Sequence, residues 1–197
     1  MAFLDTQPAL GYPLAAALGL AVGSFLNVVI LRLPRRLEWE WKRDAREILE
    51  LPELYDPPPP GVVVEPSHDP VTGDRLKWWE NIPVFSWLAL RGRSRYSGQK
   101  ISIQYPLVEL LVGLLTVLCA WRFGFGWQGF GAMVFTWFLV ALSGIDLRTR
   151  LLPDQLTLSL MWLGLIASLD RLFIDPKPAL LGAIAGYVSL WSVWWLF

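Results

Sequence analysis

Five long apolar segments dominate the pattern of hydrophobic and polar positions along the chain. They lie at roughly Leu10–Leu31, Tyr105–Trp121, Trp127–Ile145, Gln155–Leu169 and Ala179–Phe197. A helix of about 20 mostly apolar residues is long enough to cross a bilayer, and the fourth segment is the shortest of the set. We therefore predict an all-α polytopic membrane protein with about five transmembrane helices and a long loop between the first two.

The polar segment between the first two helices, residues 32–104, is too long for a plain connector. Its first part has apolar residues at helical spacing, at Leu37, Trp41, Ala45 and Ile48. This spacing predicts a helix over Arg36–Leu51 within the loop. Pro57–Pro60 then predict a stiff polyproline-type spacer, followed by a compact aromatic and basic stretch at Leu76–Ile103.

The distribution of basic residues predicts how the chain is oriented. Of the 17 Lys and Arg residues, 12 lie between Arg32 and Gln104, clustered near both membrane ends of the loop. The positive-inside rule places this loop in the cytoplasm and the N-terminus outside. Only 17% of the residues are charged, against about 25% in soluble domains. The formal net charge is zero, which gives no reason to expect a nucleic-acid partner.

Polar side chains inside apolar segments are costly and point to function. Asn27 follows Gly23 and Ser24 in the first segment, a pattern that is typical of close helix packing. Glu109 lies one turn into the second segment. Its position is equally consistent with an interfacial carboxylate and with a functional one.

Two aspartates border the connection between the third and fourth segments. Asp146 ends the third segment, at the cytoplasmic edge of the predicted topology. A carboxylate at a helix C-terminus opposes the helix dipole, which favours a functional role over a plain ion pair with Arg148 or Arg150. Asp154 precedes the fourth segment and is predicted to cap its helix by accepting first-turn N–H bonds.

Four blocks of sequence, taken together and in order, form a pattern that is specific for one protein family. They are Gly23–Val29 with Arg32–Pro34, Glu80–Leu88 with Leu90–Gly92, Ile101–Ser102 with Tyr105–Leu111, and Ile145–Asp146 with Leu152–Asp154 and Leu156–Leu158. This order resembles that of the prepilin leader peptidases. These are membrane aspartic endopeptidases and N-methyltransferases of type IV pilus and type II secretion systems.

The resemblance implies that Asp146 is the first of two catalytic aspartates. The second aspartate of the family lies in a Gly-x-Gly-Asp motif, which does not occur in these 197 residues. We therefore expect an incomplete chain. Its parts would be a first transmembrane helix (1–31), a cytoplasmic loop domain (32–104) and a membrane peptidase domain (105–197). The alternative is a non-catalytic or methyltransferase-only membrane component that binds prepilins.

The resemblance also implies the substrate and the cofactor. Prepilins or pseudopilins would lose a short basic leader on the cytoplasmic side of a bacterial inner membrane, with the lipid bilayer as the other partner. The new N-terminus would then be methylated from S-adenosylmethionine. The sequence has no glycine-rich nucleotide loop, so it does not predict where this methyl donor binds.

Many members of the family carry two Cys-x-x-Cys pairs in the loop, which indicate a structural zinc site. Alignment on Glu80–Pro83 and Leu90–Gly92 places those four positions at Asp69, Thr72, Ser94 and Ser97. The single cysteine of the chain, Cys119, lies in an apolar segment instead. His68 and Asp69 alone cannot form a closed tetrahedral site. We expect no zinc, as in the cysteine-free branch of the family.

Overall fold

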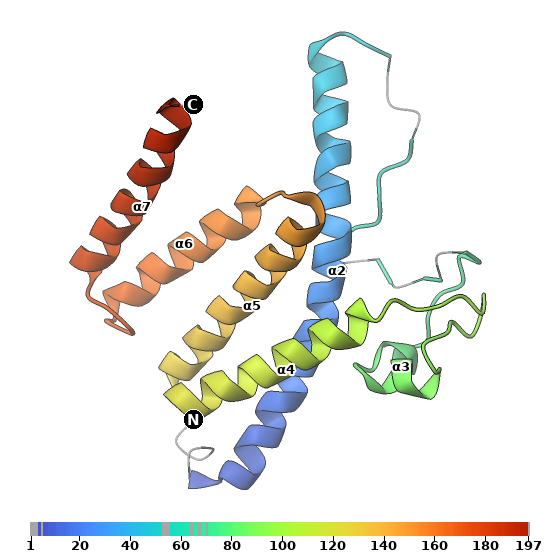
Figure 1. The fold of residues 1–197 in the computed structure, drawn as a ribbon, viewed down its shortest axis with the longest axis horizontal. Helices are drawn as coiled ribbons and strands as arrows, with labels where there is room; N and C mark the ends of the chain where they lie inside the picture. Colours follow the sequence, from blue (N-terminus) through green and yellow to red (C-terminus); the bar gives the residue numbers. More distant parts are fainter. Residues whose placement is uncertain are drawn as a thin grey trace.

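The structure is a computed structural model that describes residues 4, 6–52, 56–63, 65–66, 68–69 and 71–196, and it is built of helices (Figure 1). The longer helices are α2 (Pro8–Ile48), α4 (Gln104–Phe123), α5 (Trp127–Thr149), α6 (Asp154–Leu169) and α7 (Pro176–Leu196). The loop carries the 3-10 helix η1 (Trp78–Asn81) and the short helix α3 (Phe85–Ala89). Within the described part, β-structure is limited to two isolated bridges. The prediction of an all-α fold is confirmed.

Every apolar segment predicted from the sequence forms a helix, but the helices differ in length. In the described residues, α2, α4, α5 and α7 are long and apolar enough to cross a membrane. Helix α6 has 16 residues. At about 1.5 Å per residue it measures about 24 Å, which is shorter than the ~30 Å hydrocarbon core. The structure therefore has four full-length candidates where the sequence predicts about five.

Helix α2 corrects one expectation from the sequence. It is a single helix of 41 residues, so the first membrane helix and the helix predicted over Arg36–Leu51 are one element. Pro34 lies inside it and has no N–H to donate to the carbonyl of Ile30. Ile30 and Leu37 are both buried on one face, on either side of this missing bond. Packing of that face supports the helix across the proline.

Small residues bring α2 and α4 together at close range. A Cβ atom added to Gly19 would lie 2.8 Å from the Cα atom of Gly113. One added to Gly23 would lie 2.7 Å from the Cα atom of Glu109. No side chain fits at either distance, so the two backbones approach each other through glycine.

Helix α5 completes a three-helix core with α2 and α4. Ile145 of α5 is buried in one cluster with Ile30 of α2 and Val112 of α4. In the same interior the Trp137 Nε1–H donates to Thr116 Oγ1 at 2.9 Å, and the Thr116 hydroxyl donates to the Val112 carbonyl at 2.7 Å. These bonds satisfy polar groups that have no access to water.

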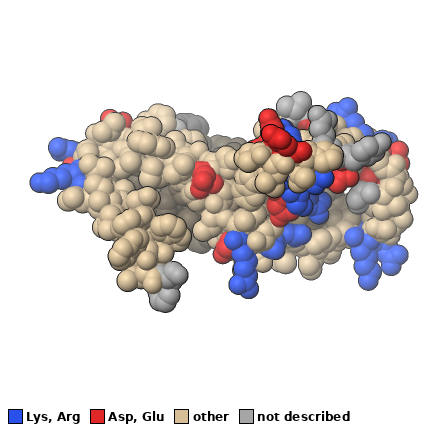
Figure 2. Space-filling view, turned by 90° about the horizontal axis from the view of Figure 1, so that it is seen from above, with Lys and Arg blue, Asp and Glu red and all other residues tan. Residues whose placement is uncertain are grey.

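The last two helices contribute little to this core, against which Leu156 at the start of α6 packs. Figure 1 shows α7 beside α6 and well apart from α2, and no residue of α7 is buried. In the space-filling view, charged side chains crowd the part of the molecule that the loop and α2 form, and much of the remaining surface is uncharged (Figure 2). The polar features of the molecule are therefore concentrated at the junction of the loop and the core.

We expect Gly19→Leu to destabilise the helical core, because the new side chain would meet Thr116 and the backbone of Gly113. Extra methylenes in a packed interface cost about 1–3 kcal/mol, so the midpoint of thermal unfolding in detergent should fall. Gly164→Leu is the matched control, since a Cβ atom at Gly164 meets nothing within 4 Å. Equal midpoints for the two variants would contradict the close crossing of α2 and α4.

Candidate functional site

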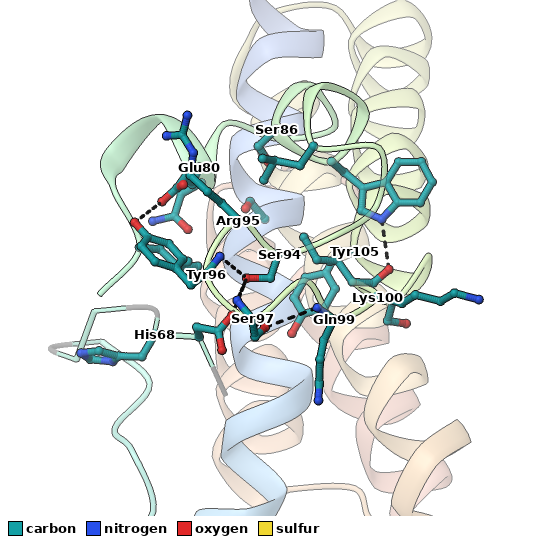
Figure 3. A pocket seen from close by; sticks show the side chains of 18 of the residues that line it. His68, Glu80, Ser86, Ser94, Arg95, Tyr96, Ser97, Gln99, Lys100 and Tyr105 are labelled. Carbon is teal, nitrogen blue, oxygen red and sulfur yellow. Dashed lines mark hydrogen bonds between the residues drawn. The ribbon is translucent and has the colours of Figure 1, made fainter. Parts of the chain in front are cut away.

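A cavity of about 390 Å³ lies where the loop meets α2 and α4 (Figure 3). Its lining includes Ser24 and Arg32 of α2, Tyr105 and Glu109 of α4, and His68, Asp69, Glu80, Ser94, Tyr96 and Lys100 of the loop. A concave site with a few converging polar groups is the default candidate for ligand binding. The side chains that line it come from segments far apart in the sequence, so its shape depends on how the loop is attached.

Glu109 attaches the loop to the helical core. The residue is 6% exposed, and its carboxylate accepts a hydrogen bond from the Val84 N–H at 2.6 Å. Val84 lies in the turn between η1 and α3. A buried carboxylate of the membrane bundle thus holds a backbone amide of the loop.

The backbone at Val84 is strained in a way that serves this contact. Its φ is 58°, in the left-handed region that a β-branched residue rarely occupies. The Phe85 N–H donates to the Pro83 carbonyl across it, which makes Val84 the centre of a γ-turn. The turn leaves the Val84 N–H unused by the loop itself and available to Glu109. Strain of this kind persists only where surrounding contacts enforce it.

Asn27 ties α2 to the start of α4. It is 1% exposed, and its Nδ2 donates to the Tyr105 carbonyl at 3.0 Å and to the Gly23 carbonyl at 3.4 Å. The first of these is the interhelical bond that the packing interpretation predicts. Its Oδ1 has no hydrogen-bond partner among the described residues. Asn27 therefore contacts α4 at Tyr105, one turn before Glu109, and both polar residues act at the same junction of α2 and α4.

Glu80 lines the cavity, and one of its two carboxylate oxygens has no hydrogen-bond partner among the described residues. Its Oε2 accepts hydrogen bonds from the Lys77 N–H at 2.7 Å and from the Tyr96 hydroxyl at 3.1 Å (Figure 3). Its Oε1 is buried and has no partner among the described residues. Burial and the bond to Glu80 raise the pKa of Tyr96 above its usual value, so the hydroxyl remains a donor. Buried acceptors in folded proteins nearly always have a donor, so this unpaired oxygen marks Glu80 as unusual.

Asp69 joins two turns of the loop at the cavity wall. It is 3% exposed, and its carboxylate accepts hydrogen bonds from the hydroxyls of Ser94 and Ser97. The bond from Ser94, assisted by the backbone N–H groups of Val71 and Thr72, holds the pKa of Asp69 well below its usual range. The carboxylate is therefore ionised at neutral pH.

The basic residues of the site divide into bound and available groups. The Arg32 guanidinium donates to the carbonyls of Gly61 at 2.9 Å and Glu65 at 3.0 Å, so it fixes the segment after the prolines against α2. Arg95 and Lys100 also line the cavity, and neither forms an ion pair with another described residue. These two cations are available to an anionic group.

Asp146 lies on the last turn of α5, exposed and outside the lining of the cavity. In the described part of the chain it forms no ion pair with Arg148 or Arg150. Arg148 donates instead to the side-chain oxygen of Gln104 at the start of α4. Arg150 adopts a left-handed conformation, and its N–H caps α5 at the Asp146 carbonyl. The ion-pair alternative is therefore not the arrangement that forms.

Asp154 begins α6 as the sequence predicts, but the expected capping bond does not form. The cap residue is Pro153, and the cap makes no side-chain hydrogen bond. Asp154 already belongs to the first turn of the helix. Its carboxylate is therefore placed to act on that turn through the helix dipole rather than as the cap. The side chain is exposed and, like Asp146, lies outside the cavity lining.

The structure thus brings Asn27 and Glu109 together and leaves Asp146 and Asp154 apart from them. It adds Glu80 and Asp69, which the sequence presents only as members of motifs. For Asp69 a signal was present in the chain. The pairs 69 and 72, and 94 and 97, have the same spacing, and each pair is followed at once by a glycine.

Known protein families and individual proteins match nearly the whole chain. The family model described as bacterial peptidase A24 N-terminal domain matches residues 17–123, and that of the type IV leader peptidase family matches residues 133–197. A prepilin leader peptidase/N-methyltransferase of Xanthomonas campestris pv. campestris is 76% identical over 197 residues, which are 100% of this chain and 69% of the relative.

More distant relatives carry the same name. The protein of Stutzerimonas stutzeri is 48% identical over 99% of this chain and 68% of its own length. The protein of Neisseria gonorrhoeae is 46% identical over 97% of this chain and 67% of its own length. No solved structure matches the chain.

We expect Glu109→Ala to loosen the attachment of the loop, because the Val84 N–H loses its acceptor. An unsatisfied buried donor costs about 1–3 kcal/mol, so amide hydrogen exchange in the peptide over residues 82–90 should accelerate. Glu109→Gln keeps an oxygen acceptor at the same reach and should exchange at an intermediate rate. Wild-type exchange in Glu109→Ala would show that this contact does not hold the loop.

Proposed function

Because this chain belongs to the type IV leader peptidase family, we propose that it is a membrane aspartic endopeptidase and N-methyltransferase that acts on prepilins or pseudopilins. The observation that carries the proposal is the 76% identity to a prepilin leader peptidase/N-methyltransferase across all 197 residues. The four long apolar helices agree with an enzyme that works in a membrane.

We place the enzyme in a bacterial inner membrane with the loop in the cytoplasm. The concentration of Lys and Arg in residues 32–104 supports this orientation. The cavity, the end of α5 and the start of α4 then share the cytoplasmic edge, since Arg148 of α5 reaches Gln104 of α4. A prepilin with a basic leader in the cytoplasm and an apolar helix in the bilayer would present its cleavage site at this level.

For the peptidase reaction we propose that Asp146 supplies one of two carboxylates. Aspartic proteolysis needs one carboxylate to take a proton from water and another to give a proton to the scissile carbonyl, and the two share a proton when they lie close together. The exposed position of Asp146 on the last turn of α5, with no ion pair among the described residues, leaves its oxygens available to water and substrate. Helix α5 is capped by Arg150, and Asp154 lies four residues later, where it supports the start of α6.

For the methylation reaction we propose that the cavity holds the methyl donor. The Glu80 carboxylate, whose Oε1 has no partner among the described residues, would accept hydrogen bonds from the hydroxyl or amino groups of S-adenosylmethionine, and Arg95 or Lys100 would meet the carboxylate of this ligand. Tyr96, Tyr105 and Trp87 offer aromatic surface for its adenine ring. When it is bound, S-adenosylmethionine supplies an activated methyl group for the new amino terminus.

The position of the cavity keeps a methyltransferase-only function as a second candidate. The described residues that line it all lie between Ser24 and Glu109, and none of them belongs to α5, α6 or α7. Methyl transfer would therefore depend on the loop and the first two long helices rather than on Asp146. The variants Asp146→Asn and Glu80→Gln distinguish the peptidase activity from the methyltransferase activity.

We expect Asp146→Asn, introduced into the natural gene, to abolish leader cleavage without affecting membrane insertion, because a neutral amide cannot take a proton from water. Cleavage is measured by the mass of a prepilin incubated with membranes. Asp170→Asn, another exposed aspartate at a helix end, is the matched control. Methylation of an already trimmed pilin should persist in both variants, and normal cleavage by Asp146→Asn would refute its assignment.

We expect Glu80→Gln to weaken the binding of S-adenosylmethionine about tenfold, because hydrogen bonds to a charged group contribute about 1.5–3 kcal/mol. The dissociation constant is measured by calorimetry on the protein in detergent. Glu47→Gln, at an exposed position near the end of α2 and outside the cavity, is the control. Unchanged affinity in Glu80→Gln would remove Glu80 from the methyl-donor site, whatever the outcome for leader cleavage.

A further inference from the structure

Two turns of the loop repeat one another in detail. In the first, the Asp69 N–H donates to the Asp74 carbonyl at 2.8 Å and the Gly73 N–H donates to the Asp69 carbonyl at 3.0 Å. In the second, the Ser94 N–H donates to the Gln99 carbonyl at 2.8 Å and the Gly98 N–H donates to the Ser94 carbonyl at 3.0 Å. Each turn is closed by one isolated bridge, between His68 and Arg75 or between Arg93 and Lys100.

The side chain that opens each turn accepts the same pair of backbone bonds. Asp69 Oδ1 accepts from the N–H groups of Val71 at 2.9 Å and Thr72 at 3.1 Å. Ser94 Oγ accepts from the N–H groups of Tyr96 at 3.1 Å and Ser97 at 3.4 Å. The glycine at the fifth position of each turn has a positive φ, 73° at Gly73 and 68° at Gly98, which other residues rarely adopt.

These turns hold the four positions at which the family motif places zinc-binding cysteines, but the residues present do not fit a metal. The set is one carboxylate, two serine hydroxyls and a threonine, whereas structural zinc takes four ligands, chiefly thiolates and imidazoles. Among the described residues, no group of three or more His, Cys, Asp and Glu lies together. Neutral hydroxyls are weak zinc ligands, so this donor set does not form a structural zinc site.

The contacts point to a different way of joining the turns. The Asp69 carboxylate receives four donors, two from the backbone of its own turn and two hydroxyls from the other turn. A carboxylate has about four lone-pair sites, so its capacity is filled. The charges are the reverse of those in a zinc site. Here a central anion is surrounded by N–H and O–H donors, whereas a zinc site has a central cation surrounded by thiolates.

We propose that Asp69 is a positioning residue that joins the two turns without a metal and thereby shapes the cavity. It acts through its neighbours, because Ser94 and Ser97 flank Tyr96, whose hydroxyl donates to Glu80 (Figure 3). Loss of the Asp69 bonds would therefore displace Tyr96 and Glu80, although Asp69 is 27 residues from Tyr96 in sequence. The link from Asp69 to methyl-donor affinity rests on the proposed function of the cavity, but the joining of the turns does not.

The test compares Asp69→Ala and Asp69→Asn with Asp74→Ala, which removes an exposed carboxylate from the same turn and serves as the control. Hydrogen exchange of the peptide over residues 93–101 is followed with and without a metal chelator. We expect exchange in this second turn to accelerate about tenfold or more in Asp69→Ala, less in Asp69→Asn, and not at all in Asp74→Ala. The chelator should leave wild-type exchange unchanged.

Either of two results would show that Asp69 does not join the turns without a metal. One is an effect of Asp69→Ala confined to residues 69–75, which would mean that the carboxylate supports only its own turn. The other is wild-type protein with one tightly bound metal ion per chain, by elemental analysis, whose removal loosens the loop. Neither readout needs substrate or methyl donor, so failure of the proposed function would not imitate either result.

A kinetic readout distinguishes positioning from general damage to the fold. Asp69→Ala should raise the KM for S-adenosylmethionine about tenfold while leader cleavage and the kcat of methyl transfer are kept. Partial recovery of the KM in Asp69→Asn would follow from its remaining carbonyl acceptor. A parallel loss of cleavage and methylation in both variants would refute a role specific to the cavity.

Discussion

The hydrogen bond from the Val84 N–H to the Glu109 carboxylate couples the loop to the membrane bundle. This hydrogen bond requires a particular local structure around each of the two residues. Glu109 can lie against α2 because Gly23 has no side chain there. Val84 can offer its N–H because the γ-turn leaves that group unpaired within the loop. The cavity between loop and core exists because these two conditions are met at one point, on the first turns of α4.

The acidic side chains of this site are held by neutral donors rather than by cations. Asp69 accepts backbone amides and hydroxyls, Glu80 accepts an amide and a phenol, and Glu109 accepts an amide. The ion pairs among the described residues lie elsewhere, on exposed surface, where such pairs contribute little. Arg95 and Lys100 form no ion pair with another described residue, so the lining of the cavity carries both positive and negative groups.

Periodicity and composition predicted the helices well, because the signal for a membrane span is local and strong. The bounds of α4 and α5 agree with the predicted segments to within a few residues. The continuity of α2 through Pro34 could not be predicted, because a proline favours a break in a helix unless tertiary packing around it compensates. The predicted third segment ends at Ile145, whereas α5 continues to Thr149. The hydrogen-bond partner of Arg148 could not be predicted, because it depends on where α4 begins.

The candidate site was predicted only in part, because some of its residues become buried only when the loop folds. Asn27 and Glu109 attract notice because polar groups are costly in apolar segments. Asp69 and Glu80 lie in a polar loop, where a carboxylate carries no such signal, and their importance comes from burial that only the folded loop creates. The γ-turn at Val84 has no sequence signature, since valine is unfavourable there.

The unbroken helix α2 also has a mechanical consequence. About 14 residues extend beyond Pro34, a lever of about 21 Å at 1.5 Å per residue. A change of about 10° in the tilt of the membrane-spanning part would swing the far end of this lever by about 3–4 Å, and membrane helices adjust tilt to bilayer thickness. Arg32, on the same helix, donates hydrogen bonds to the carbonyls of Gly61 and Glu65, which follow the proline spacer. A change in the tilt of α2 would therefore also move the segment of the loop that Arg32 holds.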